Sequence, residues 1–307
     1  MSAMTASDFA GLRGELRARE PMGRYCTWRA GGPADWLYRP ADLDDLAELL
    51  ARVPPAERLL FVGLGSNLLV RQGGWRGTVV LTHAAKRHPK LAHGRIYAEA
   101  GVASPKVARF AAMNDLCGAE FLAGIPGTVG GALAMNAGCY GGDTWEIVEE
   151  AQLIDRSGTL RWVHRSEFET GYRSCRLREG GRIGEDCWFA AARFRLAAGE
   201  REGSRQAMRK LLERRRKTQP LALPNAGSVF RNPPGAHAAK LIEACGLKGL
   251  ARGGARVSEL HANFIVNPRG AASAADIEWL IAEVQRVVRE VHGVELEPEV
   301  RLVGEAA

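Results

Sequence analysis

Residues 124–142 read Gly-Ile-Pro-Gly-Thr-Val-Gly-Gly-Ala-Leu-Ala-Met-Asn-Ala-Gly-Cys-Tyr-Gly-Gly, and this stretch limits what kind of fold the chain can have. Seven of these nineteen residues are glycine and none is charged. Glycine lacks a Cβ atom and tolerates positive φ, so neighbouring N–H groups can converge on a ligand. Because Ile, Val, Leu and Met interrupt the glycines, the stretch is unlike a flexible linker. It predicts a buried loop that cradles a large polar cofactor, or else a pair of tight turns that pack a strand against a helix.

A second glycine-containing loop lies at residues 63–68, which read Gly-Leu-Gly-Ser-Asn-Leu. It follows one apolar segment, 59–63, and precedes another, 77–82, and both are typical of short buried strands. The dinucleotide motif G-x-G-x-x-G requires a third glycine where this loop has Leu68. No G-x-x-x-x-G-K-[ST] sequence occurs in the chain either. The loop therefore offers backbone donors without belonging to either of these nucleotide-binding motifs.

The composition is that of an ordinary globular protein with room for about two domains. The 307 residues are 46% apolar and 25% charged, and the formal net charge is +7, which favours anionic ligands without naming one. Six scattered cysteines form no C-x-x-C pair, so neither a disulfide framework nor a metal site is expected. Reduced thiols indicate a cytoplasmic location, and neither a signal peptide nor a membrane-spanning segment is evident.

Three helices are indicated by the spacing of apolar residues and by the residues at their ends. Leucines between residues 43 and 50 share one face of a short helix. A second helix opens at Ser104, which we expect to be the N-cap residue because proline follows it. A third begins at Ser273, where Asp276 completes a capping box, and it ends at Gly293.

Strands are indicated where short apolar runs are bounded by turn residues. In the first two thirds of the chain these runs lie at residues 147–155, 159–164 and 188–196. In the last third, strand-like runs lie at residues 227–231 and 263–267. The predicted fold therefore mixes helices and strands in both parts of the chain.

A polar and basic segment from Ala197 to Lys217 separates these two parts and is predicted to be helical from about Ser204. Such a charge run is typical of the solvated face of a helix between domains. The alternative is a nucleic-acid-binding surface, but no aromatic residues alternate with the charges to stack on bases. We therefore expect no nucleic-acid partner.

Seven segments occur in an order that matches one known family. They are Tyr-Cys-Thr-Trp-Arg-Ala-Gly-Gly-Pro-Ala-Asp (25–35), Val-Gly-Leu-Gly-Ser-Asn-Leu-Leu-Val (62–70), Gly-Ile-Pro-Gly-Thr-Val-Gly-Gly (124–131), Met-Asn-Ala-Gly (135–138), Tyr-Arg-Ser (172–174), Ala-Gly-Ser-Val-Phe-Arg-Asn-Pro (226–233) and Glu-Pro-Glu-Val-Arg (297–301). On these residues the chain resembles the UDP-N-acetylenolpyruvoylglucosamine reductase (MurB) family. The short interval between Arg173 and Ser228 resembles the family type without an inserted tyrosine loop, and Arg231 stands where a lysine is common.

The resemblance implies an α+β fold in which an FAD-binding domain of the vanillyl-alcohol-oxidase (PCMH) type precedes an α+β substrate-binding domain. It also implies a monomer. The implied divisions are an N-terminal segment (1–24), an FAD-binding domain of two α/β subdomains split near residue 83 (25–197), a basic connecting helix (198–220), a substrate-binding domain (221–298) and a C-terminal strand returning towards the FAD site (299–307).

The resemblance also implies which residues hold FAD without a covalent bond. The loop at 63–68 would bind the diphosphate, and the long glycine-rich stretch would lie along the flavin ring and the ribityl chain. Backbone donors beside the ring would stabilise the negative charge of the reduced flavin. The implied contacts are Gly63, Gly65, Ser66, Asn67, Leu68, Gly124, Ile125, Pro126, Gly127, Thr128, Gly130, Gly131, Ala132, Asn136, Ala137 and Gly138.

The implied reaction is the reduction of UDP-N-acetylglucosamine enolpyruvate by NADPH through FAD, in peptidoglycan precursor synthesis. Hydride addition to the vinyl group leaves negative charge on the adjacent carbon and its carboxylate. Arg173 suits that carboxylate because a guanidinium donates two parallel hydrogen bonds. Glu299 suits it only if it is protonated or orients the group. Ser228 would protonate the carbon.

Further residues are implied, with less support, to contact the substrate. They are Tyr172, Lys217, Asn232, Lys240, His261 and Asn263. Lys217 would contact an anionic part of the substrate or of NADPH, whereas His261 is equally typical of a buried histidine that contacts no ligand.

Two other functions remain open at this stage. One is another flavin oxidoreductase of the same fold, for which residues 226–230 would have no role. The other is a non-catalytic protein that binds a nucleotide sugar. A colourless purified protein would favour the second, and a yellow protein bleached by NADPH would favour the reductase.

Overall fold

The structure is a computed structural model that describes residues 3–306. It divides into two compact units, each assembled from separate stretches of the chain. The first unit contains residues 1–17, 36–64 and 77–214, and the second contains residues 18–35, 65–76 and 215–307. Two short stretches from the first quarter of the sequence therefore belong with the C-terminal third. This division differs from the one expected above, in which residues 25–197 formed one domain.

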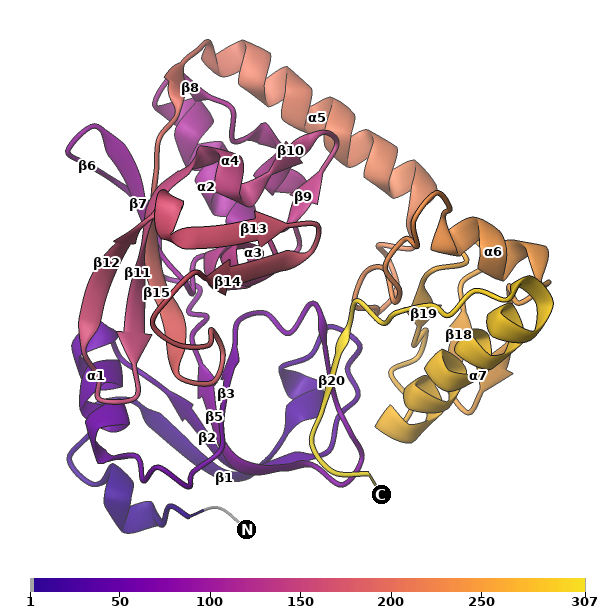
Figure 1. The fold of residues 1–307 in the computed structure, drawn as a ribbon, viewed down its shortest axis with the longest axis horizontal. Helices are drawn as coiled ribbons and strands as arrows, with labels where there is room; N and C mark the ends of the chain where they lie inside the picture. The colour runs from indigo at the N-terminus through magenta and orange to yellow at the C-terminus, as the bar shows by residue number, and fades with distance from the viewer. Residues whose placement is uncertain (1–2, 307) are drawn as a thin grey trace. The chain divides into compact units, whose positions relative to one another are not determined.

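The larger part of the first unit is built on an antiparallel sheet of five strands in the order β12-β11-β15-β7-β6 (Figure 1). The central pair, β11 and β15, contributes Ala151, Leu153, Phe189 and Ala192 to the main apolar core of the unit. The bounds are β6 Lys90–Ala92, β7 Arg95–Glu99, β11 Val148–Asp155, β12 Leu160–His164 and β15 Cys187–Phe194. The strands expected at 147–155, 159–164 and 188–196 are confirmed to within two residues.

Helices and short strands of the first unit carry the glycine-rich stretch beside this sheet. The helices are α2 Ser104–Met113, α3 Val129–Ala134 and α4 Thr144–Ile147, with a 3-10 helix over Glu120–Gly124. The hairpin of β13 Phe168–Gly171 and β14 Ser174–Leu177 follows a second 3-10 helix over Arg165–Glu167. The remaining short strands are β8 Leu116–Cys117, β9 Gly138–Cys139, β10 Gly142–Asp143 and β16 Ala197–Ala198.

A second sheet has the strand order β1-β2-β5-β3, and β3 and β5 are parallel. Its bounds are β1 Glu15–Pro21, β2 Pro33–Arg39, β3 Leu59–Val62 and β5 Trp75–Leu81, and 3-10 helices cover Ala6–Phe9 and Met22–Arg24. The helix α1, Leu43–Arg52, buries Leu46, Leu49 and Leu50 as the leucine spacing predicted. Asp42 caps this helix by accepting a hydrogen bond from the amide of Asp45 at 2.9 Å.

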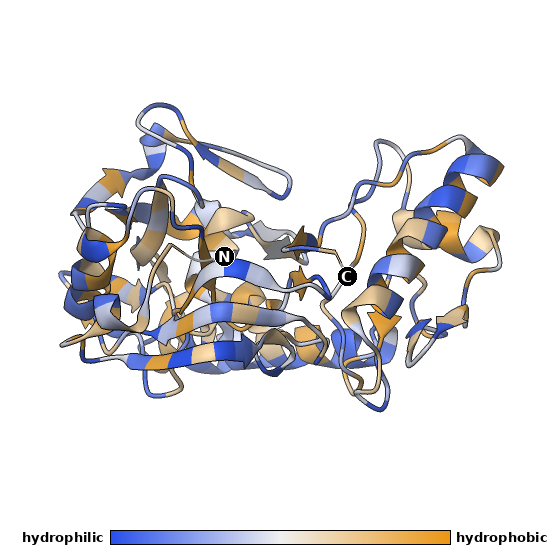
Figure 2. Ribbon diagram, turned by 90° about the horizontal axis from the view of Figure 1, so that it is seen from below, coloured by the Kyte–Doolittle hydropathy of each residue, from blue (hydrophilic) through white to orange (hydrophobic). Residues whose placement is uncertain are grey.

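The second unit packs helices α6 Ala238–Ala244 and α7 Ala274–His292 against a small antiparallel sheet of β17 Ala251–Arg252, β18 Ala255–Val257 and β19 Ile265–Val266. The apolar stripe of α7 is buried in the core of this unit, and Figure 2 shows apolar and polar residues sharing its helices. Ser273 and Asp276 form the predicted capping box, and Gly293 ends the helix with a φ of 66°.

Residues from early in the chain complete the core of the second unit. Trp28 is fully buried and its indole nitrogen donates to the carbonyl of Ile265 at 2.7 Å. The strand β4, Leu68–Val70, pairs in parallel with β20, Arg301–Val303, near the C-terminus. These long-range contacts explain why residues 18–35 and 65–76 belong with residues 215–307.

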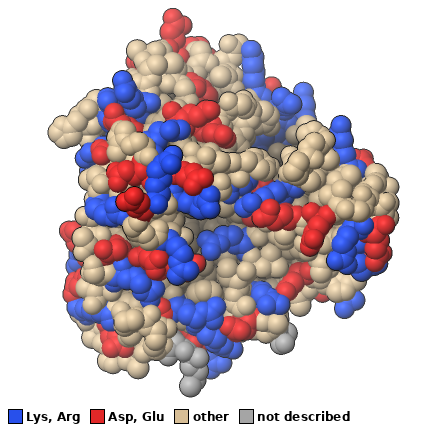
Figure 3. All heavy atoms as spheres, in the orientation of Figure 1, with Lys and Arg blue, Asp and Glu red and all other residues tan. Residues whose placement is uncertain are grey.

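The basic segment forms one long helix, α5, over Arg201–Thr218. Only Ser204 and Met208 of this helix are buried, as expected for a solvated helix. Figure 3 shows basic and acidic side chains intermixed over the face of the molecule that it displays. Within residues 3–306, no helix is both long and apolar enough to cross a membrane, and no three His, Cys, Asp or Glu side chains are grouped to bind a metal ion.

Candidate functional site

The glycine-rich stretch of the first unit folds as a loop that enters and leaves α3. The amides of Val129 and Gly130 donate to the carbonyls of Val102 and Ala100 at 2.8 and 2.9 Å. A Cβ at Gly130 would lie 2.9 Å from the Cβ of Ala100. At these two positions the loop packs against its own fold, so the tight-turn interpretation describes this part of the stretch. The amide of Gly130, which was expected to contact FAD, is bonded within the protein.

Gly63 and Thr128 show how the first unit brings its two glycine loops together. A Cβ at Gly63 would lie 2.3 Å from the Oγ1 of Thr128, so only glycine fits beside that hydroxyl. The two residues are separated by sixty-five positions in the sequence. Both were expected to contact FAD, and their proximity places the end of β3 against the start of α3.

Gly131 differs from its neighbours because the protein itself does not require a glycine there. The nearest atom to a Cβ at Gly131 would be the Oγ1 of Thr128, at an ordinary contact distance of 3.8 Å. Gly131 is exposed and lies within α3, where a glycine costs about 0.5–1 kcal/mol relative to alanine. A glycine at this position is explained if a ligand approaches the backbone, which is compatible with the expected FAD contact.

Asn136 has a structural role that the sequence did not reveal. The residue is 7% exposed and has a φ of 39°. Its Oδ1 accepts from the amide of Trp145 at 3.1 Å, and its Nδ2 donates to the carbonyl of Gly171 at 3.2 Å. The side chain thus joins the glycine-rich loop to the β13–β14 hairpin, which carries Arg173.

Arg173 lies at the tip of that hairpin and also contacts the glycine-rich loop. Its φ is 54°, in the left-handed region, and its Nη1 donates to the carbonyl of Gly138 at 3.3 Å. The guanidinium lies 5.4 Å from the ring centroid of Tyr172, which is within the range of a cation–π interaction. The first unit therefore gathers Gly63, Thr128, Gly138, Tyr172 and Arg173 around one loop.

The second unit gathers the other two predicted catalytic residues. Val229, directly after Ser228, accepts a hydrogen bond at its carbonyl from the amide of Glu299 at 2.7 Å. The Nδ2 of Asn67 donates to the carbonyl of Glu299 at 3.0 Å. Ser228 and Glu299 therefore lie in neighbouring segments, and Asn67 of the first glycine loop lies beside them.

Gly65 and Leu68 have clear structural reasons for their identity in the second unit. A Cβ at Gly65 would lie 1.9 Å from the carbonyl oxygen of Tyr25, and the φ of Gly65 is 61°. The carbonyl of Gly65 accepts from the amide of Thr27 at 3.0 Å. Leu68 is buried and begins β4. Ser66 lies between them, half-buried.

Five of the six predicted substrate contacts are dispersed over the second unit, whereas Tyr172 belongs to the first. Lys217 and Lys240 are exposed on α5 and α6. The Oδ1 of Asn232 accepts a hydrogen bond from the amide of Ala238, the first residue of α6, at 3.1 Å. Arg231, where a lysine was expected, pairs with Glu297 at 3.0 Å.

His261 and Asn263 lie together, and the ring of His261 contacts that of Phe264. Burial lowers the pKa of His261, so its imidazole is neutral near pH 7. In keeping with that state, its Nδ1 accepts from the amide of Asn263 at 3.3 Å. A neutral imidazole offers no positive charge to an anionic substrate. Asn263 is 4% exposed, and its side chain bonds the backbone of Phe230.

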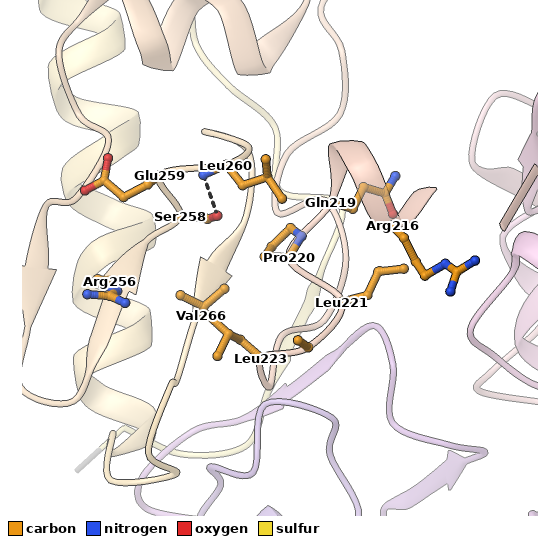
Figure 4. A pocket seen from close by; sticks show the side chains of 11 residues that line it. Arg216, Gln219, Pro220, Leu221, Leu223, Arg256, Ser258, Glu259, Leu260 and Val266 are labelled. Carbon is orange, nitrogen blue, oxygen red and sulfur yellow. Dashed lines mark hydrogen bonds between the residues drawn. The ribbon is translucent and has the colours of Figure 1, made fainter. Parts of the chain in front are cut away.

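A cavity of about 650 Å³ in the second unit was not predicted from the sequence (Figure 4). Its lining combines apolar side chains with two arginines and one glutamate, a chemistry suited to a ligand with both apolar and polar parts. None of the six predicted substrate contacts lines it. The lining residues are Arg216, Gln219, Pro220, Leu221, Ala222, Leu223, Arg256, Ser258, Glu259, Leu260 and Val266.

Comparison with known families finds two matches, one in each half of the chain. Residues 34–164 match the family described as "FAD binding domain". Residues 219–303 match the family described as "UDP-N-acetylenolpyruvoylglucosamine reductase, C-terminal domain". The chain is therefore an α+β flavoprotein in which an FAD-binding domain precedes a reductase C-terminal domain, which confirms the expected fold class.

Individual relatives extend this similarity over nearly the whole chain. The UDP-N-acetylenolpyruvoylglucosamine reductase of Alkalilimnicola ehrlichii is 54% identical over 293 residues, covering 95% of this chain and 96% of that protein. The reductase of the same name from Legionella pneumophila strain Corby is 51% identical, covering 100% and 98%. The solved MurB structure from Thermus caldophilus aligns with a TM-score of 0.77 and 31% identity, covering 95% and 99%. The chain belongs to the UDP-N-acetylenolpyruvoylglucosamine reductase family.

Proposed function

We propose that this protein reduces UDP-N-acetylglucosamine enolpyruvate to UDP-N-acetylmuramate with NADPH as the electron donor, as a step of peptidoglycan precursor synthesis. The observation that carries the proposal is the pairing of Val229 with Glu299, which holds a hydroxyl and a carboxyl in neighbouring segments. Relatives that share about half of their residues with this chain bear the name of that reductase. In this proposal the protein acts as a cytoplasmic monomer on small molecules.

FAD, when bound, would supply the chemistry of hydride transfer between NADPH and the terminal vinyl carbon of the substrate. The glycine loops at 63–68 and 124–138 would hold it through backbone groups. A covalent link through Cys26 or Cys175 is not expected, because desolvation raises the pKa of each thiol to about 12. Protonated thiols are poor nucleophiles.

The residues of this chain have two tasks once hydride reaches the substrate. Negative charge develops on the adjacent carbon and spreads into the carboxylate, so a cation and a proton donor are required. Arg173 is proposed to bind the carboxylate with two parallel hydrogen bonds. The left-handed backbone at Arg173 and its bond to Gly138 limit the directions in which the guanidinium can point.

Ser228 is proposed to donate the proton, and Glu299 to orient the reacting group. A hydroxyl is a weak acid, but a carbanion is a strong base, so the pair can exchange a proton. A protonated Glu299 could also donate a hydrogen bond to the substrate carboxylate, whereas an ionised one would repel it. The net result is addition of one hydride and one proton across the carbon–carbon double bond.

An anaerobic two-step experiment tests the proposal. The purified protein is expected to be yellow, to lose its flavin absorbance on addition of NADPH, and to regain it on addition of UDP-N-acetylglucosamine enolpyruvate. NADH serves as the comparison donor. A colourless protein would contradict the proposal and favour a nucleotide-sugar-binding protein. Reoxidation by oxygen but not by the enolpyruvyl compound would favour another oxidoreductase of the same fold.

Gly131→Ala is expected to separate stability from cofactor binding. Because Gly131 is an exposed helical glycine with space for a Cβ, alanine should raise the free energy of unfolding of the apoprotein by about 0.5–1 kcal/mol. The same methyl group should weaken FAD binding if the cofactor lies against this backbone. Urea denaturation of the apoprotein and fluorescence titration with FAD measure the two effects. Unchanged FAD affinity would remove Gly131 from the cofactor site.

A further inference from the structure

The side chain of Asn263 bonds both peptide groups of one residue in the segment that carries Ser228. Its Oδ1 accepts from the amide of Phe230 at 2.9 Å, and its Nδ2 donates to the carbonyl of Phe230 at 2.8 Å. Asn263 and Phe230 are 4% and 2% exposed, so water does not replace these bonds. The side-chain carboxamide of Asn263 therefore makes the two hydrogen bonds to Phe230 that a neighbouring strand would make, although residues 227–229 form no strand.

The segment after Ser228 is held from two sides by backbone bonds as well. The amide of Val229 donates to the carbonyl of Asn263 at 2.9 Å, and the carbonyl of Val229 accepts from the amide of Glu299 at 2.7 Å. On the other side of Ser228, Gly227 has a φ of 79°, and no atom lies within 4 Å of the position that a Cβ would take. The position of Ser228 is therefore fixed by Val229 and Phe230 on its C-terminal side, and by the bond from the amide of Gly227 to the Oδ1 of Asn225 at 2.9 Å on its N-terminal side.

An asparagine is the side chain that this arrangement needs. A carboxylate can only accept hydrogen bonds and would face the carbonyl of Phe230 with a like partial charge, and an aliphatic side chain would leave both groups of Phe230 unsatisfied. Unsatisfied buried peptide groups seek new partners, and the segment that carries them shifts. A shift of about 1 Å at a reacting group can lower a rate by about 10²-fold.

We propose that Asn263 is a positioning residue for the hydroxyl of Ser228, acting through the backbone of Val229 and Phe230 and not through contact with the substrate. This inference rests on the proposed role of Ser228 as proton donor. It replaces the substrate contact that the sequence suggested for Asn263. Substitution of Asn263 should therefore slow reoxidation of the flavin by the enolpyruvyl substrate, and not its reduction by NADPH.

Asn263→Leu in the FAD-loaded full chain tests the proposal. The rate constant of flavin reoxidation by the enolpyruvyl substrate should fall about 10- to 100-fold, while flavin reduction by NADPH stays within about twofold. Hydrogen–deuterium exchange at the amide of Phe230, followed by mass spectrometry, should become faster. This exchange measurement reports the loss of the two hydrogen bonds between Asn263 and Phe230 independently of activity.

Asn267→Leu is the matched control within the same unit. Asn267 is fully buried, and its side chain donates to the carbonyl of Trp28 at 2.9 Å and accepts from the amide of Ala272 at 3.0 Å. It resembles Asn263 in burial and in bonding two backbone groups, but these groups lie outside residues 228–230. Its substitution should lower stability comparably and leave the ratio of the two half-reaction rates within about twofold of wild type.

A double variant distinguishes this inference from the proposed function. If Asn263 acts through Ser228, Asn263→Leu should add little to the loss already caused by Ser228→Ala. Multiplied losses, an unchanged reoxidation rate, or an effect confined to the KM of the enolpyruvyl substrate would overturn the inference. If Ser228→Ala alone leaves reoxidation intact, the proposed role of Ser228 fails instead. Should Asn263→Leu not fold, Asn263→Asp retains the acceptor for Phe230, and the same split between half-reactions is expected.

Discussion

Ser228→Ala is expected to lower the rate of flavin reoxidation by the enolpyruvyl substrate by about 10²- to 10⁴-fold, while reduction of the flavin by NADPH stays within about twofold of wild type. The asymmetry follows from the proposed chemistry, because a proton for the substrate carbon is needed only in the second half-reaction. Anaerobic stopped-flow absorbance measures both rates on one preparation. Ser228 is half-buried, so loss of its hydroxyl should leave the fold intact.

Ser273→Ala provides a matched serine in the same unit. Its hydroxyl accepts from the amide of Asp276 at 3.1 Å as the N-cap of α7. Its loss should cost about 0.5–2 kcal/mol of stability and change neither half-reaction. If Ser228→Ala slowed both half-reactions equally, as a general disturbance would, Ser228 would be a structural residue and the assignment of the proton donor would be wrong.

Local signals in the sequence predicted several elements well. The capping box at Ser273 and the terminal Gly293 fix both ends of α7 by hydrogen bonds within a few residues, so the sequence alone contains the information. At the start of α2 the predicted N-cap residue, Ser104, was wrong by one position. Ala103 is the N-cap residue there and Ser104 is the first helical residue. The amide of Ser104, which has no partner within the helix, donates to the distant carbonyl of Gly127 at 3.0 Å.

The C-terminal third was harder to predict because its backbone conformation depends on hydrogen bonds to residues far away in the sequence. Residues 227–231 were expected to form a strand, but only Phe230 makes a bridge, with Pro298. The hydrogen bonds that a strand partner would make with Phe230 come from the side chain of Asn263, thirty-three residues away. Likewise, nothing local to Trp28 indicates that its indole donates to Ile265. Which segments of the chain make up the second unit could therefore not be predicted from the sequence.

The candidate site shows the same division between local and distant information. Motif order identified the loops that belong to an FAD-binding domain, and comparison confirmed that family. The sequence did not separate glycines required by the fold from glycines available to a ligand. A Cβ at Gly63 or Gly130 would lie too close to Thr128 or Ala100, whereas a Cβ at Gly131 would make only an ordinary contact with Thr128. That distinction requires the positions of residues far apart in the chain.

Gly65→Ala is expected to destabilise the protein by about 2–5 kcal/mol and to lower its FAD content. The estimate combines about 1–2 kcal/mol for a left-handed backbone at a residue with a Cβ and about 1–3 kcal/mol for steric overlap. Overlap is severe here because the Cβ would lie 1.9 Å from the carbonyl oxygen of Tyr25 and 2.8 Å from the Cα of Cys26. Both are backbone atoms, which cannot rotate away as a side chain could.

Gly293→Ala isolates the backbone contribution to this effect. Gly293 has a φ of 66°, close to the 61° of Gly65, but no atom lies within 4 Å of its Cβ position. Its substitution should therefore cost only about 1–2 kcal/mol and leave the ratio of flavin to protein absorbance unchanged. Urea denaturation of both variants gives the comparison. Equal losses in the two variants would show that Tyr25 moves away from Gly65, and that the close approach of these segments is not what requires a glycine in this loop.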